Sequence, residues 1–484
     1  MEWHKLLNSG RRKDKEKSTH SEVSDLAFGR QEIERDFDRL LFAAPTRRLA
    51  DKTQVFPLDL NDSVRTRLTH SHEVANFARG IGMRLAFEMK NEIFGSCGEN
   101  LCLERDVPAL LATIGLAHDL GNPPFGHQGE AAMRNWFRRE LKPLVDRIPD
   151  DAIKPVFNDF LNFDGNSQTL RLVTRLQIIN DNYGLNLTYA TLAAMIKYPR
   201  SSCSKKTIWD KHGFLFSEEK VVHEIWEETG LSEGQRHPFT YLMEACDDIA
   251  YSVLDAEDTV KKGLASYQDL ISFLATWNDG ADSVIADLIK KVEEKNQEWA
   301  FRKQDLSPAE INDLSMQMFR VVSTNILIKS VVETFANTHK QLCQTDCTVQ
   351  DLISISTGNE LCVALKKFDK TRGYRHRTVL ELELKGSNYI QGLMDMLWVG
   401  IKGRQSGSHT WDTPFGRYAY GRISENYRRV FEDTGNDLPP LYKEAQLLTD
   451  AISGMTDSYL IRLHDELKSL YEYEGRFQPS TPEA

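Results

Sequence analysis

The sequence predicts a mostly α-helical fold, and three observations support this prediction. From about residue 31 onward, apolar residues recur at intervals of three to four along most of the chain. Hydrophobic residues make up 40% and charged residues 27% of the 484 residues, values near the globular average that exclude wholesale disorder. A single stretch, 378–384, alternates apolar and polar residues, so we expect at most a short β element there.

The helices can be taken in chain order. The first pattern begins at Glu32 and ends near Pro45, and the second forms one face of a long helix between 66 and 89. A third runs from 107 to 117, where Gly-Asn-Pro-Pro at 121–124 stops it. Further helices are predicted over 168–180, 188–198, 217–229, 238–262, 268–274, 282–297, 308–336 and 441–471.

The chain divides into three regions by composition. Residues 1–30 carry many charges and few apolar groups, which predicts a flexible N-terminal arm. We expect a helical core over 31–265 and a helical C-terminal region over 266–484. No linker rich in proline or glycine marks the boundary at 265.

Charge and cysteine content limit the class of protein. The net charge of −11 excludes a bulk cationic surface for nucleic acid, although a local basic patch stays open. No apolar run approaches the roughly 20 residues that span a bilayer, and the basic start has no apolar stretch behind it. Seven scattered cysteines, an odd number, favour reduced thiols, and we expect a cytoplasmic protein.

Four polar residues on apolar helix faces suggest a metal site: His70, His118, Asp119 and Asp247. Taken singly, each has an ordinary structural explanation: a hydrogen-bonded core histidine, a helix cap or an exposed acid. Together they bring a His, a His-Asp pair and an Asp from three helices toward one interior. Charged groups are rarely buried unless paired or bound to metal, and this mixed nitrogen and oxygen set suits a hard divalent cation.

The string His70 … His118-Asp119 … Asp247 resembles the H…HD…D signature of the HD-domain phosphohydrolases. The longer strings at 52–57 (KTQVFP), 65–71 (RTRLTHS) and 118–130 (HDLGNPPFGHQGE) are similar to those of bacterial deoxyguanosine triphosphate triphosphohydrolases, or dGTPases. The strings at 163–166, 243–251 and 452–457 resemble the same family, so the resemblance covers nearly the whole chain. It implies an HD-domain helical core followed by a helical extension.

The resemblance also implies roles for individual residues. His70, His118, Asp119 and Asp247 would bind one divalent metal, Mg²⁺ or Mn²⁺, with Asp247 preferred over Asp248 by the family's D-x-x-x-Y-x-x-x-D spacing. His127 and Glu130 match the catalytic pair. The substrate-binding residues it implies are Arg67, Lys197 and Tyr198 at the triphosphate, Asn166 lining the site, Gln54, Tyr251 and Asp255 at the deoxyribose, and Arg417 for nucleotide or DNA contact.

The implied reaction is metal-dependent hydrolysis of dGTP to deoxyguanosine and tripolyphosphate, by attack of water at the α-phosphorus. Two alternatives stay open: a broad-specificity dNTP triphosphohydrolase, and a binding protein that responds to dNTPs or single-stranded DNA. By the same resemblance we expect a homo-oligomer, a hexamer, with single-stranded DNA as a possible effector and no membrane partner.

Overall fold

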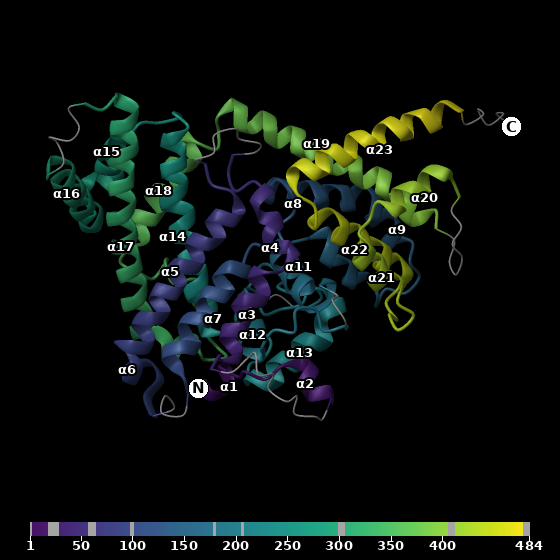
Figure 1. Cartoon of the computed structure of the whole chain (residues 1–484), viewed down its shortest axis with the longest axis horizontal. Coiled ribbons are helices and arrows are strands. Elements are labelled where there is room, and N and C mark those ends of the chain that lie inside the picture. Colours follow the sequence, from purple (N-terminus) through teal and green to yellow (C-terminus); the bar gives the residue numbers. More distant parts are fainter. Residues whose placement is uncertain are drawn as a thin grey trace.

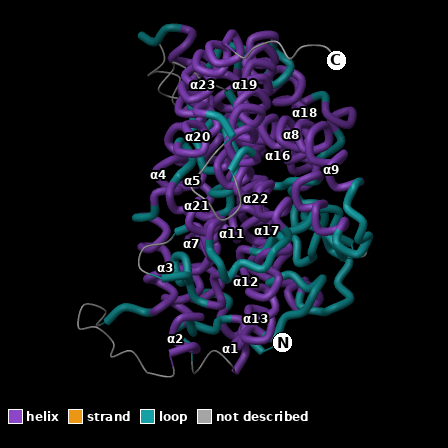
Figure 2. The backbone as a smooth tube through the Cα atoms, turned by 90° about the vertical axis from the view of Figure 1, so that its right-hand side faces the viewer, coloured by secondary structure: helices purple, strands orange, loops and turns teal. Residues whose placement is uncertain are grey.

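The computed structural model describes residues 2–17, 29–56, 64–96, 101–177, 181–204, 208–298, 305–404 and 412–477. Helices connected by loops make up this part of the chain (Figures 1 and 2). Extended pairing among these residues is limited to three isolated bridges, which join Arg11 to Thr188, Thr53 to Thr66 and Ser201 to Phe214. The mostly α-helical fold is therefore confirmed.

The helices have the following bounds. The first group is α1 (Trp3–Leu6), α2 (Arg12–Lys17), α3 (Glu32–Leu41), α4 (Ala44–Arg48), α5 (Arg67–Phe87), α6 (Lys90–Phe94) and α7 (Leu103–Ala117). The second is α8 (Gly126–Trp136), α9 (Lys142–Asp146), α10 (Asn158–Leu161), α11 (Gly165–Arg171), α12 (Tyr189–Met195), α13 (Glu219–Thr229) and α14 (Pro238–Lys261). The third is α15 (Tyr267–Ala275), α16 (Ser283–Glu298), α17 (Pro308–Leu342), α18 (Asn359–Arg372), α19 (Arg377–Lys402), α20 (Pro414–Gly421), α21 (Glu425–Glu432), α22 (Pro440–Ser453) and α23 (Asp457–Phe477).

Two sequence predictions need correction. The stretch 378–384 is not a β element but the first turns of α19, whose Leu380 and Leu384 are exposed. The second half of α19 buries Ile390 and Leu397 against neighbouring helices, and this packing overrides the weak local strand preference. The predicted helix over 441–471 is two helices, broken after Ser453. The Tyr427 hydroxyl occupies the space that a side chain at Gly454 would need, which explains the glycine at this break.

The N-terminal segment packs against the helical core, so the flexible arm predicted for residues 1–30 is wrong over residues 2–17. The Trp3 side chain is buried, and its indole N–H donates to the carbonyl of Ile93 at 2.9 Å. The Arg11 guanidinium pairs with the buried Asp36 at 2.7 Å. These two anchors compensate for the high charge of the segment, which was the basis of the prediction. Residues 18–28 lie outside the described residues.

Two clusters of buried apolar side chains form the core. The first gathers residues of α1, α5, α7 and α12 to α18, and the second gathers residues of α8 to α10 and α19 to α23. Apolar packing therefore groups 267–372 with the helices at the N-terminal side, and groups α8 with the C-terminal helices. Figure 1 shows the same arrangement, with α14 to α18 at one end of the molecule and α19 to α23 at the other. The domain division at 265 stays a prediction.

None of the helices in the described part of the chain combines the length and apolarity needed to cross a membrane. The six described cysteines, Cys102, Cys203, Cys246, Cys343, Cys347 and Cys362, are free thiols.

Candidate metal centre and catalytic site

Three helices bring two imidazole rings and a carboxylate together. His70 lies on α5, His118 directly follows α7, and Asp247 lies on α14. Asp247 Oδ1 lies 3.1 Å from Nε2 of His70 and 3.4 Å from Nε2 of His118. One potential ligand atom from each of the three side chains lies within 4.8 Å of the others. The arrangement follows from the close packing of α5, α7 and α14, whose apolar faces carry these polar groups inward.

The His118 ring is oriented for metal binding by a hydrogen bond on its far side. Its Nδ1–H donates to the carbonyl of Gly115 at 2.7 Å, so Nε2 is the ring atom that a metal would bind in place of a proton. Nε2 is buried, and no hydrogen-bond donor approaches it among the described residues. Burial alone would lower the pKa of His118, but the carboxylates of Asp119 and Asp247 raise it to about 9. The two carboxylates therefore favour a positive charge next to Nε2 of His118. A divalent cation would supply that charge, and the nitrogen and oxygen donors of the cluster fit such an ion.

Asp119 lies beside this cluster but is held differently. Its Oδ2 is 3.5 Å from Nε2 of His118 and pairs with the Arg67 guanidinium, while Oδ1 accepts from the Asn122 amide at 2.5 Å. Burial would raise the pKa of Asp119, but the cations of Arg67 and His118 lower it to about 2. The carboxylate is therefore ionised and available to a metal at neutral pH.

The adjacent acids on α14 face opposite ways. Burial would raise the pKa of Asp247, yet His118 and His70 hold it well below its usual range. Asp248 instead accepts a hydrogen bond from Lys366 of α18 at 2.6 Å. Asp247 is therefore the member of the pair that faces the histidines.

The loop between α7 and α8 lies against Arg67 and leads into the segment of α8 that carries His127 and Glu130. Phe125, the residue before α8, has a left-handed backbone with φ of 59°, an unusual conformation for a bulky residue. Its N–H donates to Asp457 Oδ1 at 3.1 Å. At Gly126 φ is +55°, and a Cβ there would lie 2.3 Å from Nη2 of Arg67. Glycine is thus required where the backbone and Arg67 meet.

His127 and Glu130 lie one turn apart on α8. The His127 side chain is 77% exposed, and its Nδ1 lies 3.1 Å from Oε2 of the buried Glu130. The other carboxylate oxygen of Glu130 accepts from the N–H of Gly165 at 2.7 Å. The ring therefore presents Nε2 to a cavity of about 570 Å³, which both residues line. A histidine oriented by a carboxylate in this way can serve as a proton donor or acceptor.

Two lysines and Tyr198 lie on another side of the site. Lys197 Nζ is 3.4 Å from Glu244 of α14, and Lys211 pairs with Asp164 at 2.6 Å. Both ammonium groups lie 5.8 Å from the centre of the Tyr198 ring. Burial would lower the pKa of Lys197, but Glu244 raises it, so the side chain is charged. Sequence reasoning missed Lys211, because it lies between the strings with family resemblance at 163–166 and 243–251 and belongs to neither.

Farther along α14, Tyr251 and Asp255 face α18 and the residues after it. The Tyr374 hydroxyl donates to Asp255 Oδ2 at 2.6 Å, and the Tyr251 and Tyr374 rings lie 6.0 Å apart. Asp255 Oδ1 and Gln54 Oε1 are buried without a hydrogen-bond partner in the described structure, as expected for groups that await a ligand. Burial raises the pKa of Asp255 well above its usual range. Tyr374 was not predicted, since no periodic signal singles it out.

The two remaining predicted residues are Asn166, whose side chain binds Asp164, and Arg417, which is exposed on α20. The amide of Asn166 donates to Asp164 at 2.6 Å, so Asn166 reaches the site through the Asp164–Lys211 pair. Arg417 is exposed on α20, which packs mainly on α19 and α23. A missed residue is Asn122, which holds Asp119. Its position three residues after Asp119, in a loop that returns toward it, was the available signal.

Comparisons with known proteins give one consistent result. The family profile described as "HD domain" matches residues 67–150, the segment that contains His70, His118 and Asp119. A Listeria monocytogenes protein named "Deoxyguanosinetriphosphate triphosphohydrolase-like protein" is 34% identical over 483 residues, covering 97% of this chain and all of that protein. A protein of the same name from Pseudomonas aeruginosa is 30% identical and covers 99% of this chain and all of its own length. The "Deoxyguanosinetriphosphate triphosphohydrolase" of Serratia proteamaculans is 30% identical, covering 92% of this chain and 94% of that protein.

Proposed function

The chain belongs to the deoxyguanosinetriphosphate triphosphohydrolase family of HD-domain proteins, and on that premise we propose that it hydrolyses dGTP to deoxyguanosine and tripolyphosphate. The observation that carries the proposal is the convergence of His70, His118 and Asp247, with Asp119 beside them, next to cationic side chains and a His–Glu pair. A site for a small organic cation or an uncharged ligand would need neither the arginine nor the lysines.

The metal would be held by His70, His118, Asp119 and Asp247. When bound, a divalent cation such as Mg²⁺ or Mn²⁺ supplies Lewis-acid activation of the α-phosphate and neutralises the charge that develops there. The relative affinity of this His/Asp set for the two ions does not follow from the ligand types alone.

The chain's own residues would position the substrate and move the proton. Arg67 and Lys197 offer charged donors to the phosphate oxygens, and the Tyr198 hydroxyl offers another. Gln54, Tyr251 and Asp255 would meet the deoxyribose. Water would attack the α-phosphorus and the 5′-oxygen of the nucleoside would leave with a proton, for which His127, held by Glu130, is the proposed carrier. No covalent intermediate with the protein is required.

The quaternary and cellular assignments rest on the family resemblance. We propose a homo-oligomer, a hexamer, in the cytoplasm, with single-stranded DNA as a possible effector and Arg417 as a contact residue. The net charge of −11 would confine such DNA binding to a local patch and make it sensitive to salt.

Product analysis tests the proposal most directly. Purified protein is incubated with Mg²⁺ or Mn²⁺ and each of the four dNTPs and GTP separately, and the products are resolved by ion-pair chromatography. Deoxyguanosine plus intact tripolyphosphate, with dGTP much the fastest, is the expected result. Equal rates on all four dNTPs would keep the chemistry and replace the substrate assignment by a broad one. Release of pyrophosphate or single phosphates would contradict attack at the α-phosphorus.

A further inference from the structure

Lys52 is a buried lysine at the meeting point of three segments. Only 3% of the residue is exposed, and its Nζ donates to the carbonyl of Asn122 at 2.6 Å and to that of Ser453 at 2.8 Å. Its own carbonyl accepts the N–H of Arg67 at 3.1 Å. One side chain and its backbone thus join the loop after α7, the end of α22 and the start of α5.

This placement is costly, which argues against a passive role. Both recorded acceptors are neutral carbonyls, and burial, reinforced by the nearby Arg67 cation, lowers the pKa of Lys52 to about 7. A buried amine held by neutral groups stabilises a fold less than an apolar side chain of similar size would. What Lys52 contributes instead is orientation, because its two hydrogen bonds fix the directions of the Asn122 and Ser453 carbonyls.

One of these carbonyls belongs to the residue that holds a predicted metal ligand. The Asn122 N–H donates to the carbonyl of Asp119 at 3.2 Å, and its side-chain amide donates to Asp119 Oδ1 at 2.5 Å. Lys52 Nζ holds the carbonyl oxygen of Asn122, the backbone acceptor of the same residue. The orientation of Asp119 therefore depends on Asn122, and that of Asn122 depends on Lys52.

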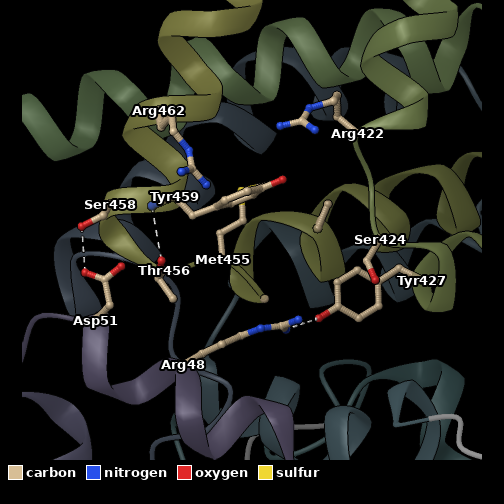
Figure 3. Close-up of a pocket in the computed structure, with 12 residues that line it drawn as sticks. Arg48, Asp51, Arg422, Ser424, Tyr427, Met455, Thr456, Ser458, Tyr459 and Arg462 are labelled. Atoms are coloured by element: carbon tan, nitrogen blue, oxygen red, sulfur yellow. Dashed lines mark hydrogen bonds between the residues drawn. The ribbon is translucent and has the colours of Figure 1, made fainter.

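The other carbonyl lies at the junction of α22 and α23. The segment from Gly454 to Ser458 lines a cavity of about 600 Å³, together with Arg48 and Tyr427 (Figure 3). Next to it, Asp457 accepts from the backbone N–H of Thr53 at 2.9 Å and also from the Thr53 hydroxyl. The two side chains at this junction differ: the Thr53 hydroxyl binds Asp457 of the C-terminal segment, whereas the Lys52 ammonium binds both Ser453 and the loop that carries Asp119 and Asn122.

We propose that Lys52 is a positioning residue for the metal centre, which holds the Asn122 carbonyl against the end of α22 and thereby keeps the Asn122 amide on Asp119. The inference rests on the proposed function, since it concerns the same metal site. In the described structure the Lys52 side chain donates to Asn122 and Ser453 and to no predicted metal ligand, so we expect a change of this side chain to act through Asn122.

The test measures Mn²⁺ affinity of the full chain by electron paramagnetic resonance, without substrate. Lys52→Met removes both donors at similar length, and we expect its Mn²⁺ dissociation constant to rise by about tenfold, the lower end of the range for residues that orient metal ligands. Asn122→Ala should weaken binding similarly. The double variant should be no weaker than the weaker single variant, because both changes remove one path. Losses that multiply in the double variant would overturn the proposal.

Thr53→Val is the matched control, since it weakens contact with Asp457 at the same junction but leaves Asn122 untouched. We expect it to lower the midpoint of thermal unfolding while Mn²⁺ affinity stays at the parent value. If Lys52→Met does not fold, Lys52→Gln retains amide donors and should keep part of the affinity. Parental affinity in the folded Lys52→Met chain, or equal losses in Thr53→Val, would overturn the positioning role alone. A parent chain that binds no Mn²⁺ would overturn the metal site and the proposed function with it.

Discussion

At the scale of single residues, the group that contacts Nδ1 of an imidazole influences the role that Nε2 of the same ring can take. The Nδ1 of His118 donates to a neutral backbone carbonyl, so the buried Nε2, beside Asp247, is the ring atom that a metal would bind in place of a proton. The Nδ1 of His127 faces the carboxylate of Glu130 instead, and the ring is exposed to the cavity. A carboxylate partner stabilises the protonated ring, whereas a carbonyl partner at a cationic site favours a ligand. The two histidines therefore have different assignments despite their proximity in sequence.

The first prediction concerns His127. Because His127 lies outside the metal cluster and carries the proposed proton transfer, His127→Ala should lower kcat by about 100- to 10,000-fold. Mn²⁺ affinity should stay at the parent value. Steady-state kinetics on dGTP and Mn²⁺ titration of the same preparation measure both. Full activity in His127→Ala would remove its catalytic assignment, and loss of Mn²⁺ would make it a ligand instead.

The second prediction compares the two neighbouring acids of α14. Asp247→Asn should abolish specific Mn²⁺ binding, because the carboxylate between His70 and His118 is lost. Asp248→Asn should keep binding, since Asp248 pairs with Lys366. Bound ion at 100 times its dissociation constant stabilises a fold by about 2.7 kcal/mol, so Mn²⁺ should raise the unfolding midpoint of the parent and of Asp248→Asn.

In this comparison EDTA should reverse the stabilisation in both chains that bind the ion. An Asp247→Asn chain that still gains stability from Mn²⁺ would show that the ion binds elsewhere. Loss of binding in Asp248→Asn rather than Asp247→Asn would assign the ligand to the other acid.

At the scale of elements, α14 is the helix on which most of the site depends. It carries Asp247, Tyr251 and Asp255 at successive intervals of four, so one face serves the metal, the site wall and the proposed sugar contacts. Its N-terminus is capped by His237, whose Nδ1 accepts the N–H of Phe239 at 3.1 Å. The Nε2 of the same ring lies 3.2 Å from the carbonyl of Leu6, so it donates there. The neutral ring thus caps α14 and anchors the N-terminal segment at once.

The third prediction is a pH dependence from this cap. Burial lowers the pKa of His237 from 6.5 to about 4. Between these values the unfolded chain binds a proton that the folded chain does not. The free energy of unfolding should therefore fall as the pH drops from about 6.5 to 4, by roughly 3 kcal/mol from this group.

Denaturant titration of the parent and of His237→Asn at pH 8 and pH 5 measures the effect. Asparagine caps helices well but does not titrate, so the variant should lose less stability on acidification than the parent. Equal losses in the two chains would contradict a neutral His237 in the folded state.

At the scale of the whole molecule, a buried ionic group links the two apolar clusters. Arg171, on α11, donates to Asp450 of α22 from Nε at 2.8 Å and from Nη2 at 2.7 Å, and to Glu218 from Nη1 at 2.8 Å. All three side chains are at most 3% exposed. Leu170 and Leu172 belong to the first cluster, and Leu448 and Ala451 to the second. The group therefore joins the C-terminal helices to the core that carries the metal ligands.

The fourth prediction is that Arg171→Met destabilises the fold by about 3–5 kcal/mol, because two buried carboxylates lose their cation. The matched control is Lys142→Met, which removes an exposed pair with Asp146 and should change stability by less than about 0.5 kcal/mol. Denaturant unfolding at pH 7 measures both. A loss below 1 kcal/mol in Arg171→Met would show that the junction does not depend on the ionic group.

The sequence by itself was sufficient to predict the helical class and the H…HD…D set. Helical periodicity is a local property, and motif residues are legible because their spacing places them on apolar faces. The same reasoning was wrong at 378–384, where long-range packing of α19 decides the local structure, and over 441–471, where it missed the break between α22 and α23. It was also wrong for residues 2–17. Their charge suggested a free arm, but Trp3 binds Ile93 and Arg11 pairs with Asp36, and neither partner belongs to the N-terminal segment.

Only the tertiary structure decided how the site residues meet. The family's spacing implied Asp247 rather than Asp248 as the ligand, but the distance of Asp247 from the histidines depends on how α14 packs against α5, α7 and α18. That Lys52 and Tyr374 join the site depends on contacts between remote segments, 70 and 401 residues apart for Lys52 and 119 residues apart for Tyr374. Side-chain chemistry is written in the sequence, but distance and orientation between remote segments arise only when the apolar faces pack and fix them.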